Sequence, residues 1–198
     1  MTAAGASNPF ATRFTRPGAI EFLLPPGESP ESLIARLRAN AWQGELVGPH
    51  GVGKSTLLAM FATHLAAAGR QVVHAALHQG ETTLPPPLDQ WKTWNSATQV
   101  IVDGYEQLTW WSRSKLAWRV REQGAGLLVT SHAPTGLPLL MSLAPKVEVA
   151  LQVVRQLMPD EQRITNSDVE RTFLTCNGNI REMLFQLYDL YQLKSQSE

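Results

Sequence analysis

One short segment in the first third of the chain carries the strongest chemical signal. Residues 48–56 read Gly-Pro-His-Gly-Val-Gly-Lys-Ser-Thr and contain the pattern G-x-x-x-x-G-K-S. The glycines let backbone N–H groups approach an anion, because no side chain stands in the way. Lys54 supplies a positive charge for the β- and γ-phosphates, and Ser55 supplies a hydroxyl oxygen for Mg²⁺. The segment therefore predicts a site for a nucleoside triphosphate with Mg²⁺, and we name it the phosphate-binding loop.

The sequence on both sides of this loop supports the same interpretation. Leu46 and Val47 precede it as a buried strand would, and the apolar spacing of residues 57–65 predicts a helix that starts at the loop. The N-terminal dipole of such a helix favours an anion. We expect Lys54 to face solvent until phosphate arrives. The expected nucleotide-binding residues are Gly48, Pro49, His50, Gly51, Val52, Gly53, Lys54, Ser55 and Thr56.

Two further strands end in polar residues. The apolar run 99–103 ends in Asp103, which is placed to hold Mg²⁺ together with Ser55. The run 126–131 ends in Thr130 and Ser131 and is followed by a histidine. One of these two hydroxyls either senses the γ-phosphate or positions water, or both simply cap the loop.

The elements that must position these residues alternate between strand and helix. Strands are predicted over 44–48, 71–78, 99–103, 126–131 and 147–154, with a short one over 19–24. Helices are predicted over 29–41, 56–68 and 108–122. This alternation indicates a parallel sheet covered on both faces, so the expected fold class is α/β, in three α/β/α layers with a small helical C-terminal extension.

The domain organisation follows from where the patterns change. Residues 1–18 show little periodicity and are expected to form a flexible N-terminal arm, and residues 19–158 form the α/β domain. Residues 159–198 form a small helical extension that resembles a lid, with helices over 165–176 and 179–193.

Composition excludes several classes of protein. The 198 residues carry 17 basic and 17 acidic side chains, so no global field attracts nucleic acid or an anionic membrane. No apolar run reaches the ~18 residues of a membrane span. A single cysteine rules out a disulfide framework and indicates a reducing compartment, so a cytoplasmic location is expected.

Three features together resemble the AAA+ class and its relatives among the additional-strand (ASCE) P-loop ATPases. They are the phosphate-binding loop, Asp103, and the segment 178–184, Gly-Asn-Ile-Arg-Glu-Met-Leu. The last is similar to the "sensor 2" helix of an AAA+ lid. The resemblance implies ATP and Mg²⁺ as cofactors, a γ-phosphate sensor role for Arg181, and a sensor 1 role for Thr130 or Ser131. ATP is preferred over GTP because the guanine motif N-K-x-D is absent from the sequence.

One position departs from this class. The acid expected directly after Asp103 is replaced by Gly104, so a catalytic base must come from elsewhere. Glu106 is the favoured candidate and Glu81, after the second strand, is the alternative. Three functions stay open: a slow or regulated ATPase coupled to a protein partner, a small-molecule or nucleotide kinase, and an ATP-dependent switch or scaffold that does not hydrolyse ATP. Few basic residues in the loop 133–146 argue against the kinase.

A tryptophan-rich helix suggests a further contact surface. Residues 108–122 contain three of the six tryptophans, and Trp111 and Trp118 lie seven residues apart on one face, so some are expected in the core. Exposed tryptophans would favour a protein interface. Stacking on single-stranded nucleic acid is the alternative, with local charge from Arg113, Lys115, Arg119 and Arg121.

Overall fold

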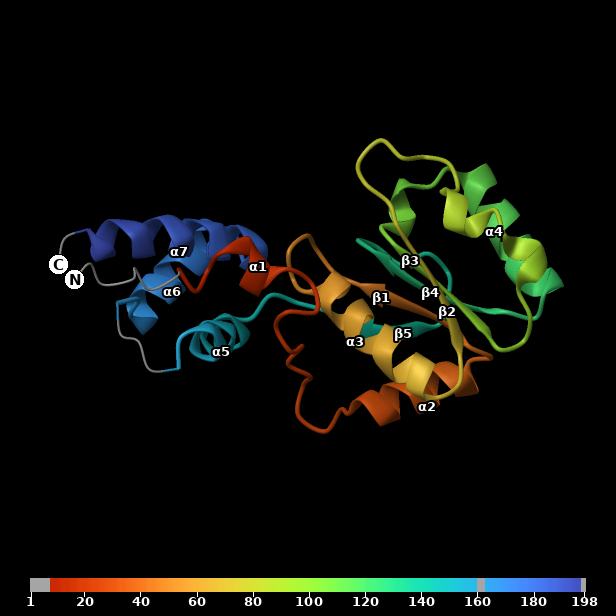
Figure 1. Ribbon diagram of the computed structural model, residues 1–198, viewed down its shortest axis with the longest axis horizontal. Coiled ribbons are helices and arrows are strands. Elements are labelled where there is room, and N and C mark those ends of the chain that lie inside the picture. Colours follow the sequence, from red (N-terminus) through yellow and green to blue (C-terminus); the bar gives the residue numbers. More distant parts are fainter. Residues whose placement is uncertain (1–7, 160–162, 197–198) are drawn as a thin grey trace, which may run out of the picture. The chain divides into compact units, whose positions relative to one another are not determined.

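A five-stranded parallel sheet forms the centre of the α/β part of the chain. The computed structural model describes residues 8–159 and 163–196. The strands are β1 Gln43–Val47, β2 Gln71–Ala76, β3 Thr98–Asp103, β4 Gly126–Ser131 and β5 Leu139–Ser142. Their order in the sheet is β2-β3-β4-β1-β5, and every neighbouring pair is parallel (Figure 1). The carboxyl ends of all five strands therefore meet at one edge.

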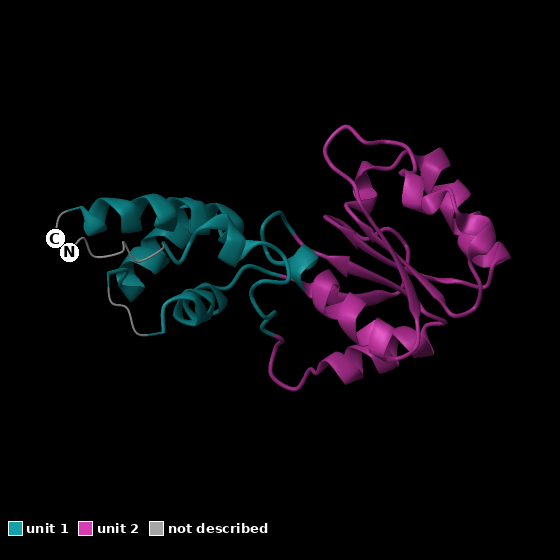
Figure 2. Cartoon of the chain, viewed as in Figure 1, with its two compact units in different colours: residues 1–23, 49–56, 144–198 teal, residues 24–48, 57–143 magenta. Residues whose placement is uncertain are grey.

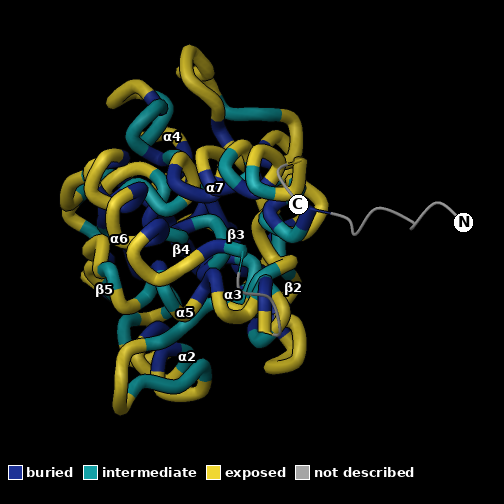
Figure 3. The backbone as a smooth tube through the Cα atoms, turned by 90° about the vertical axis from the view of Figure 1, so that its left-hand side faces the viewer, coloured by how far each residue is buried: buried dark blue, intermediate teal, exposed yellow. Residues whose placement is uncertain are grey.

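Helices cover both faces of this sheet. Helices α2 (Pro30–Ala39) and α3 (Lys54–Ala67) lie on one side, and α4 (Trp110–Glu122) lies on the other (Figure 1). Because side chains alternate along a strand, Val100 and Val102 of β3 pack with Leu116 of α4 in one apolar cluster. The two central strands β3 and β4 are buried almost throughout, as the dark blue trace shows (Figure 3). This burial explains their continuous apolar runs.

The remaining helices form a second compact unit with its own core. They are α1 Thr12–Thr15, α5 Val147–Leu157, α6 Asn166–Thr175 and α7 Ile180–Ser195. Residues 1–23, 49–56 and 144–198 make up this unit, which we call the helical unit (Figure 2). The phosphate-binding loop groups with it, whereas residues 24–48 and 57–143 form the sheet unit.

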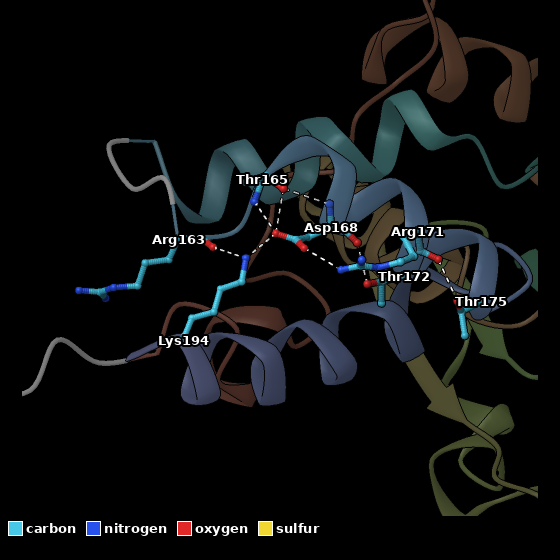
Figure 4. Close-up of polar contacts among 7 residues, drawn as sticks. All are labelled: Arg163, Thr165, Asp168, Arg171, Thr172, Thr175 and Lys194. Carbon is cyan, nitrogen blue, oxygen red and sulfur yellow. Dashed lines mark hydrogen bonds and ion pairs between the residues drawn. The ribbon is translucent and has the colours of Figure 1, made fainter. Parts of the chain in front are cut away.

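An acid at the start of α6 ties the helical unit together (Figure 4). Asp168 and Thr165 form a reciprocal N-terminal cap, and Lys194 of α7 donates to the carboxylate of Asp168 at 2.7 Å. Arg171 donates to the other carboxylate oxygen at 2.8 Å. Burial alone raises the pKa of Asp168, but the hydrogen bonds from Lys194 and Thr165 outweigh it and lower this pKa to about 2.

Two segments differ from the sequence-based prediction. Residues 147–154 form α5 and not a strand, because Val147, Ala150 and Val154 recur at helical spacing and turn into the helical core. The fifth strand is instead the short β5, which pairs with β1. Residues 19–24 form no strand. Helix α5 lies in the C-terminal segment of the helical unit, residues 144–198.

The N-terminal segment also differs from the expected flexible arm over 1–18. Phe10 is 1% exposed and meets Tyr191 of α7 edge to face, with ring centroids 6.1 Å apart. The side-chain amide of Asn8 donates to the carbonyl oxygen of Tyr188 at 3.0 Å. Residues 8–10 are therefore part of the helical core, while residues 1–7 of that prediction lie outside the described residues.

Short helical turns connect the sheet unit's larger elements. They are the 3-10 turns η1 Pro86–Leu88, η2 Trp91–Thr93 and η3 Tyr105–Gln107. Within residues 8–159 and 163–196, no helix combines the length and the apolar character needed to span a membrane.

Candidate functional site

The phosphate-binding loop leaves β1 at Gly48 and ends in the first turn of α3. Gly51 has φ +72°, in the left-handed region, and a Cβ at this position would overlap the Oδ1 atom of Asn179. The positive φ favours glycine, and any larger residue would also displace the Asn179 side chain. A Cβ on Gly53 would lie 3.2 Å from the ring of Phe22, so the loop is enclosed by the N-terminal segment as well.

Lys54 does not face solvent, which corrects the expectation from sequence. The residue is 9% exposed, and its Nζ donates a hydrogen bond to the carbonyl oxygen of Pro49 at 2.7 Å. The ammonium group therefore contacts the backbone of the loop itself. Ser55 follows at the start of α3 and is partly buried. The loop offers a lysine, a hydroxyl and a helix N-terminus to an anion.

Asp103 and Thr130 form a pair at the carboxyl ends of β3 and β4. The Thr130 hydroxyl donates to the Oδ1 of Asp103 at 2.6 Å and accepts from the N–H of Gly104 at 2.9 Å. Thr130 is fully buried. Ser131 instead donates to the carbonyl oxygen of Ala133 at 2.7 Å, within its own loop. Of the two hydroxyls considered for the sensor role, only Thr130 contacts the candidate metal ligand within the described residues.

The turn after Asp103 explains why no acid follows it. Gly104 has φ +82°, and a Cβ there would lie 2.8 Å from the backbone carbonyl oxygen of Leu77. The N–H of Leu77 also donates to the carbonyl oxygen of Asp103 at 2.8 Å, so the two segments cannot separate without breaking this hydrogen bond. Position 104 therefore excludes a glutamate by backbone strain and by steric overlap.

Glu106 occupies the short turn η3 that follows. Its Oε1 lies 3.1 Å from the Nε2 of His132, which comes directly after β4. Its Oε2 is buried and has no hydrogen-bond partner among the described residues. Arg113 of α4 donates to the carbonyl oxygens of Glu106 and Leu108, at 2.9 and 3.0 Å, and so holds the turn in place. The carboxylate keeps one oxygen available for a new hydrogen bond.

Glu81, the alternative base, has a different environment. Its side chain accepts from the N–H of His78 at 2.8 Å, and its own N–H donates to the carbonyl oxygen of His78. The residue is exposed. This carboxylate closes a local turn after β2, which is a structural role found often for acids in loops.

Arg181 lies in the first turn of α7. Asn179 caps this helix, since its Oδ1 accepts from the N–H of Glu182 at 3.0 Å. The same side chain packs on Gly51, so the N-terminus of α7 lies against the phosphate-binding loop. Arg181 itself is exposed, and its guanidinium group lies 6.0 Å from the centre of the Phe185 ring.

Solved structures provide the comparison. Neither a protein-family model nor a curated protein sequence matches the chain. Cdc6p from Pyrobaculum aerophilum is similar with a TM-score of 0.64 at 14% identity, over 94% of this chain and 66% of that one. A point variant of RuvB from Thermotoga maritima has a TM-score of 0.54 at 17% identity, over 80% of this chain. The Hsp104–ADP complex of S. cerevisiae has a TM-score of 0.58 at 13% identity, over 90% of this chain.

The order of the strands separates the two that lead to candidate site residues. In the sheet β4 lies between β1, which leads into the phosphate-binding loop, and β3, which ends in Asp103. The chain shares the α/β P-loop NTPase fold with these structures. It spans 59% of the RuvB chain and 32% of the Hsp104 chain.

Sequence reasoning missed the contacts of three residues near the candidate site. Asn179 belongs to the segment 178–184 that resembles sensor 2, yet its contact with Gly51 joins two segments far apart in the chain. Phe22 and His132 likewise contact Gly53 and Glu106 through tertiary structure alone. A signal existed only for His132, because it directly follows a strand that ends in polar residues.

The donor chemistry of the site fits Mg²⁺. Ser55 offers a hydroxyl and Asp103 a carboxylate, both of them hard oxygen ligands. Among the described residues no cluster of three or more His, Cys, Asp or Glu side chains could hold a metal ion.

Proposed function

We propose that the chain binds Mg-ATP at the phosphate-binding loop and hydrolyses it slowly, in a cycle coupled to a protein partner. The observation that carries this proposal is the conformation of the loop itself. Gly51 has a positive φ that favours glycine and lies against the Asn179 side chain, and Lys54 donates to the carbonyl oxygen of Pro49 within the loop. Phosphate can replace that carbonyl as the partner of Lys54 without a large movement, because both offer an oxygen acceptor.

Ser55 and Asp103 would hold the Mg²⁺ ion, which neutralises charge on the β- and γ-phosphates. Thr130 supports Asp103 by donating to one carboxylate oxygen, and it leaves the other oxygen to face the metal or its water. This hydrogen bond fixes the orientation of the Asp103 carboxylate at the end of β3.

Glu106 would orient the attacking water. A catalytic base needs a lone pair within reach of the proton that it takes, and the Oε2 of Glu106 has no partner among the described residues. His132 contacts the other oxygen and so limits the rotation of the carboxylate. Glu81 is a weaker candidate, because its carboxylate already accepts from the N–H of His78.

A specific observation favours a second function, an ATP-dependent switch that hardly turns over. Gly104 removes the acid from the position next to Asp103, and the structure permits no side chain there. The base must then act from η3, one turn further on. Single-turnover ATP hydrolysis with and without a partner extract distinguishes the two functions, since a switch leaves ATP intact in both.

Calorimetry tests the binding site directly. Lys54→Ala should weaken ATP binding by about tenfold to a hundredfold, because it removes a charge-assisted contact to phosphate. Lys146→Ala is the matched control, since Lys146 is exposed and its side chain caps nothing at the start of α5. An unchanged affinity in folded Lys54→Ala protein would overturn the assignment of the loop.

Arg181 is proposed to sense the γ-phosphate. The contact between Asn179 and Gly51 brings the first turn of α7 to the loop, and the arginine projects from that turn. ATP should then bind more tightly than ADP, and Arg181→Ala should remove most of the difference. Arg155→Ala, an exposed arginine on α5, is the control. An equal loss of affinity for ATP and ADP would show that Arg181 is a surface residue and not a γ-phosphate sensor.

A further inference from the structure

Three tryptophans are exposed on α4, contrary to the expectation that some of them lie in the core. Trp110 is 68% exposed, Trp111 75% and Trp118 53%. Trp110 and Trp111 meet edge to face at 4.6 Å, and Trp118 meets Trp91 in the same way at 5.1 Å. Apolar area of this size on one helix marks an interaction surface. We call the exposed side of α4 that carries these three residues the tryptophan face.

The charge around this face does not suit a polyanion. Arg119 is 6% exposed and donates to the carbonyl oxygen of Leu88 at 2.8 Å, and Arg113 holds the η3 turn. Of the four basic residues on α4, only Lys115 and Arg121 are exposed, and Glu122 offsets one of them. Binding of single-stranded nucleic acid needs a basic track along the backbone as well as stacking rings. The face therefore fits a protein.

The order of residues along α4 indicates which kind of protein surface fits this face. Trp111, Lys115, Trp118 and Glu122 follow one line on the surface, because residues three and four apart are neighbours on a helix. The side chains along this line are, in order, aromatic, basic, aromatic and acidic. If a second α4 lies antiparallel with the two-fold axis near Trp118, each Lys115 meets the other copy's Glu122. The two Trp118 rings then meet at the axis.

We propose that the tryptophan face is the contact between two copies of this chain, formed by antiparallel α4 helices. Such an isologous contact needs a surface that is complementary to itself, and the positions of Lys115 and Glu122 on either side of Trp118 meet that requirement. Ser114 and Ala117 on the adjacent line are small and allow close approach. Aromatic residues of this exposure supply roughly half of the ~800 Å² that each partner buries in a stable interface.

The oligomeric state of the full chain tests the proposal. Analytical ultracentrifugation across the micromolar range should show a monomer–dimer equilibrium. Lys115→Glu and Glu122→Lys should each weaken the dimer by about tenfold or more. Each substitution places like charges opposite one another at both symmetry-related contacts of the dimer. The double variant should restore the affinity, and so should a mixture of the two single variants, since their faces are complementary. Arg38→Glu on α2 is the control for the change in charge.

Trp118→Ala gives a second and independent readout. The Trp118 ring of each copy lies at the proposed two-fold axis, so the substitution removes two rings from one interface. It should raise the dimer dissociation constant by about thirtyfold or more. Circular dichroism shows whether the contact with Trp91 is needed for folding, and the charge variants leave that contact intact. A monomer at every concentration, or a dimer unaffected by the charge reversals, would overturn the proposal. So would binding of an oligothymidine that requires Trp118.

Discussion

Two carboxylates, the buried Asp168 of the helical unit and the partly buried Glu106 of the sheet unit, have opposite environments. Asp168 accepts hydrogen bonds on both oxygens, from Thr165, Arg171 and Lys194, and its pKa is lowered to about 2 despite its burial. Glu106 has His132 on one oxygen, and its other oxygen is buried without a partner among the described residues.

The difference separates an acid that holds a fold together from one that can act on a ligand. A carboxylate that accepts hydrogen bonds on both oxygens is already engaged, and its removal leaves its partners unsatisfied. A buried oxygen without a partner costs free energy and is kept where a ligand or a water completes it. Substitution of each acid should therefore affect a different property of the protein.

The largest effect is expected for Glu106→Gln. Turnover of ATP should fall by about 10²-fold or more, because the amide cannot take a proton from water. Nucleotide affinity should be retained, since Glu106 is not expected to touch the phosphates. Steady-state phosphate release together with calorimetry measures both. A variant with normal turnover would show that another group is the base.

Asp168→Asn should affect stability and not chemistry. Loss of the charge weakens the hydrogen bonds to Lys194 and Arg171, and we expect the free energy of unfolding to fall by about 2–3 kcal/mol. Urea denaturation followed by circular dichroism gives this value. ATP affinity of the folded fraction should stay within error of wild type. Lost affinity with unchanged stability would reverse the proposed division between the two acids.

The pH dependence of stability sharpens the same contrast. The folded-state pKa of Asp168 is about 2 and its ordinary value is 3.8. The contribution of this carboxylate to the free energy of unfolding is therefore present above about pH 4. It is lost as the pH falls from 4 towards 2, because the carboxylate must then take up a proton and give up its pairs. We expect a loss of about 1–2 kcal/mol over this range. Asp168→Asn should not show this part of the acid destabilisation.

The smallest effect is expected for Glu81→Gln. The side chain is exposed and accepts one bond from the N–H of His78, which a glutamine oxygen can also accept. Stability should change by less than about 0.5 kcal/mol, as for most surface substitutions. Turnover should match wild type in the assay used for Glu106→Gln. A large fall in turnover would identify Glu81 as the base and leave the buried oxygen of Glu106 unexplained.

Much of the sheet could be predicted from sequence because its signals are local. The strands over 126–131 and 99–103, and the cap of α6 at Thr165, depend on apolar runs and capping residues that are neighbours in the chain. The prediction of a strand over 147–154 is wrong, because a short run rich in Val and Leu fits a buried strand and a buried helix equally well. Packing against α6 and α7 decides between them.

The sequence alone determined the phosphate-binding loop, its lysine and the acid at the end of β3, because each is specified by residue type and spacing within a few positions. Tertiary structure decided the rest. The carbonyl oxygen of Leu77 excludes a side chain at position 104, Thr130 rather than Ser131 reaches Asp103, and Asn179 packs on Gly51 across more than half of the chain. These contacts join residues brought together only when the chain folds, and no local pattern encodes a distance between them.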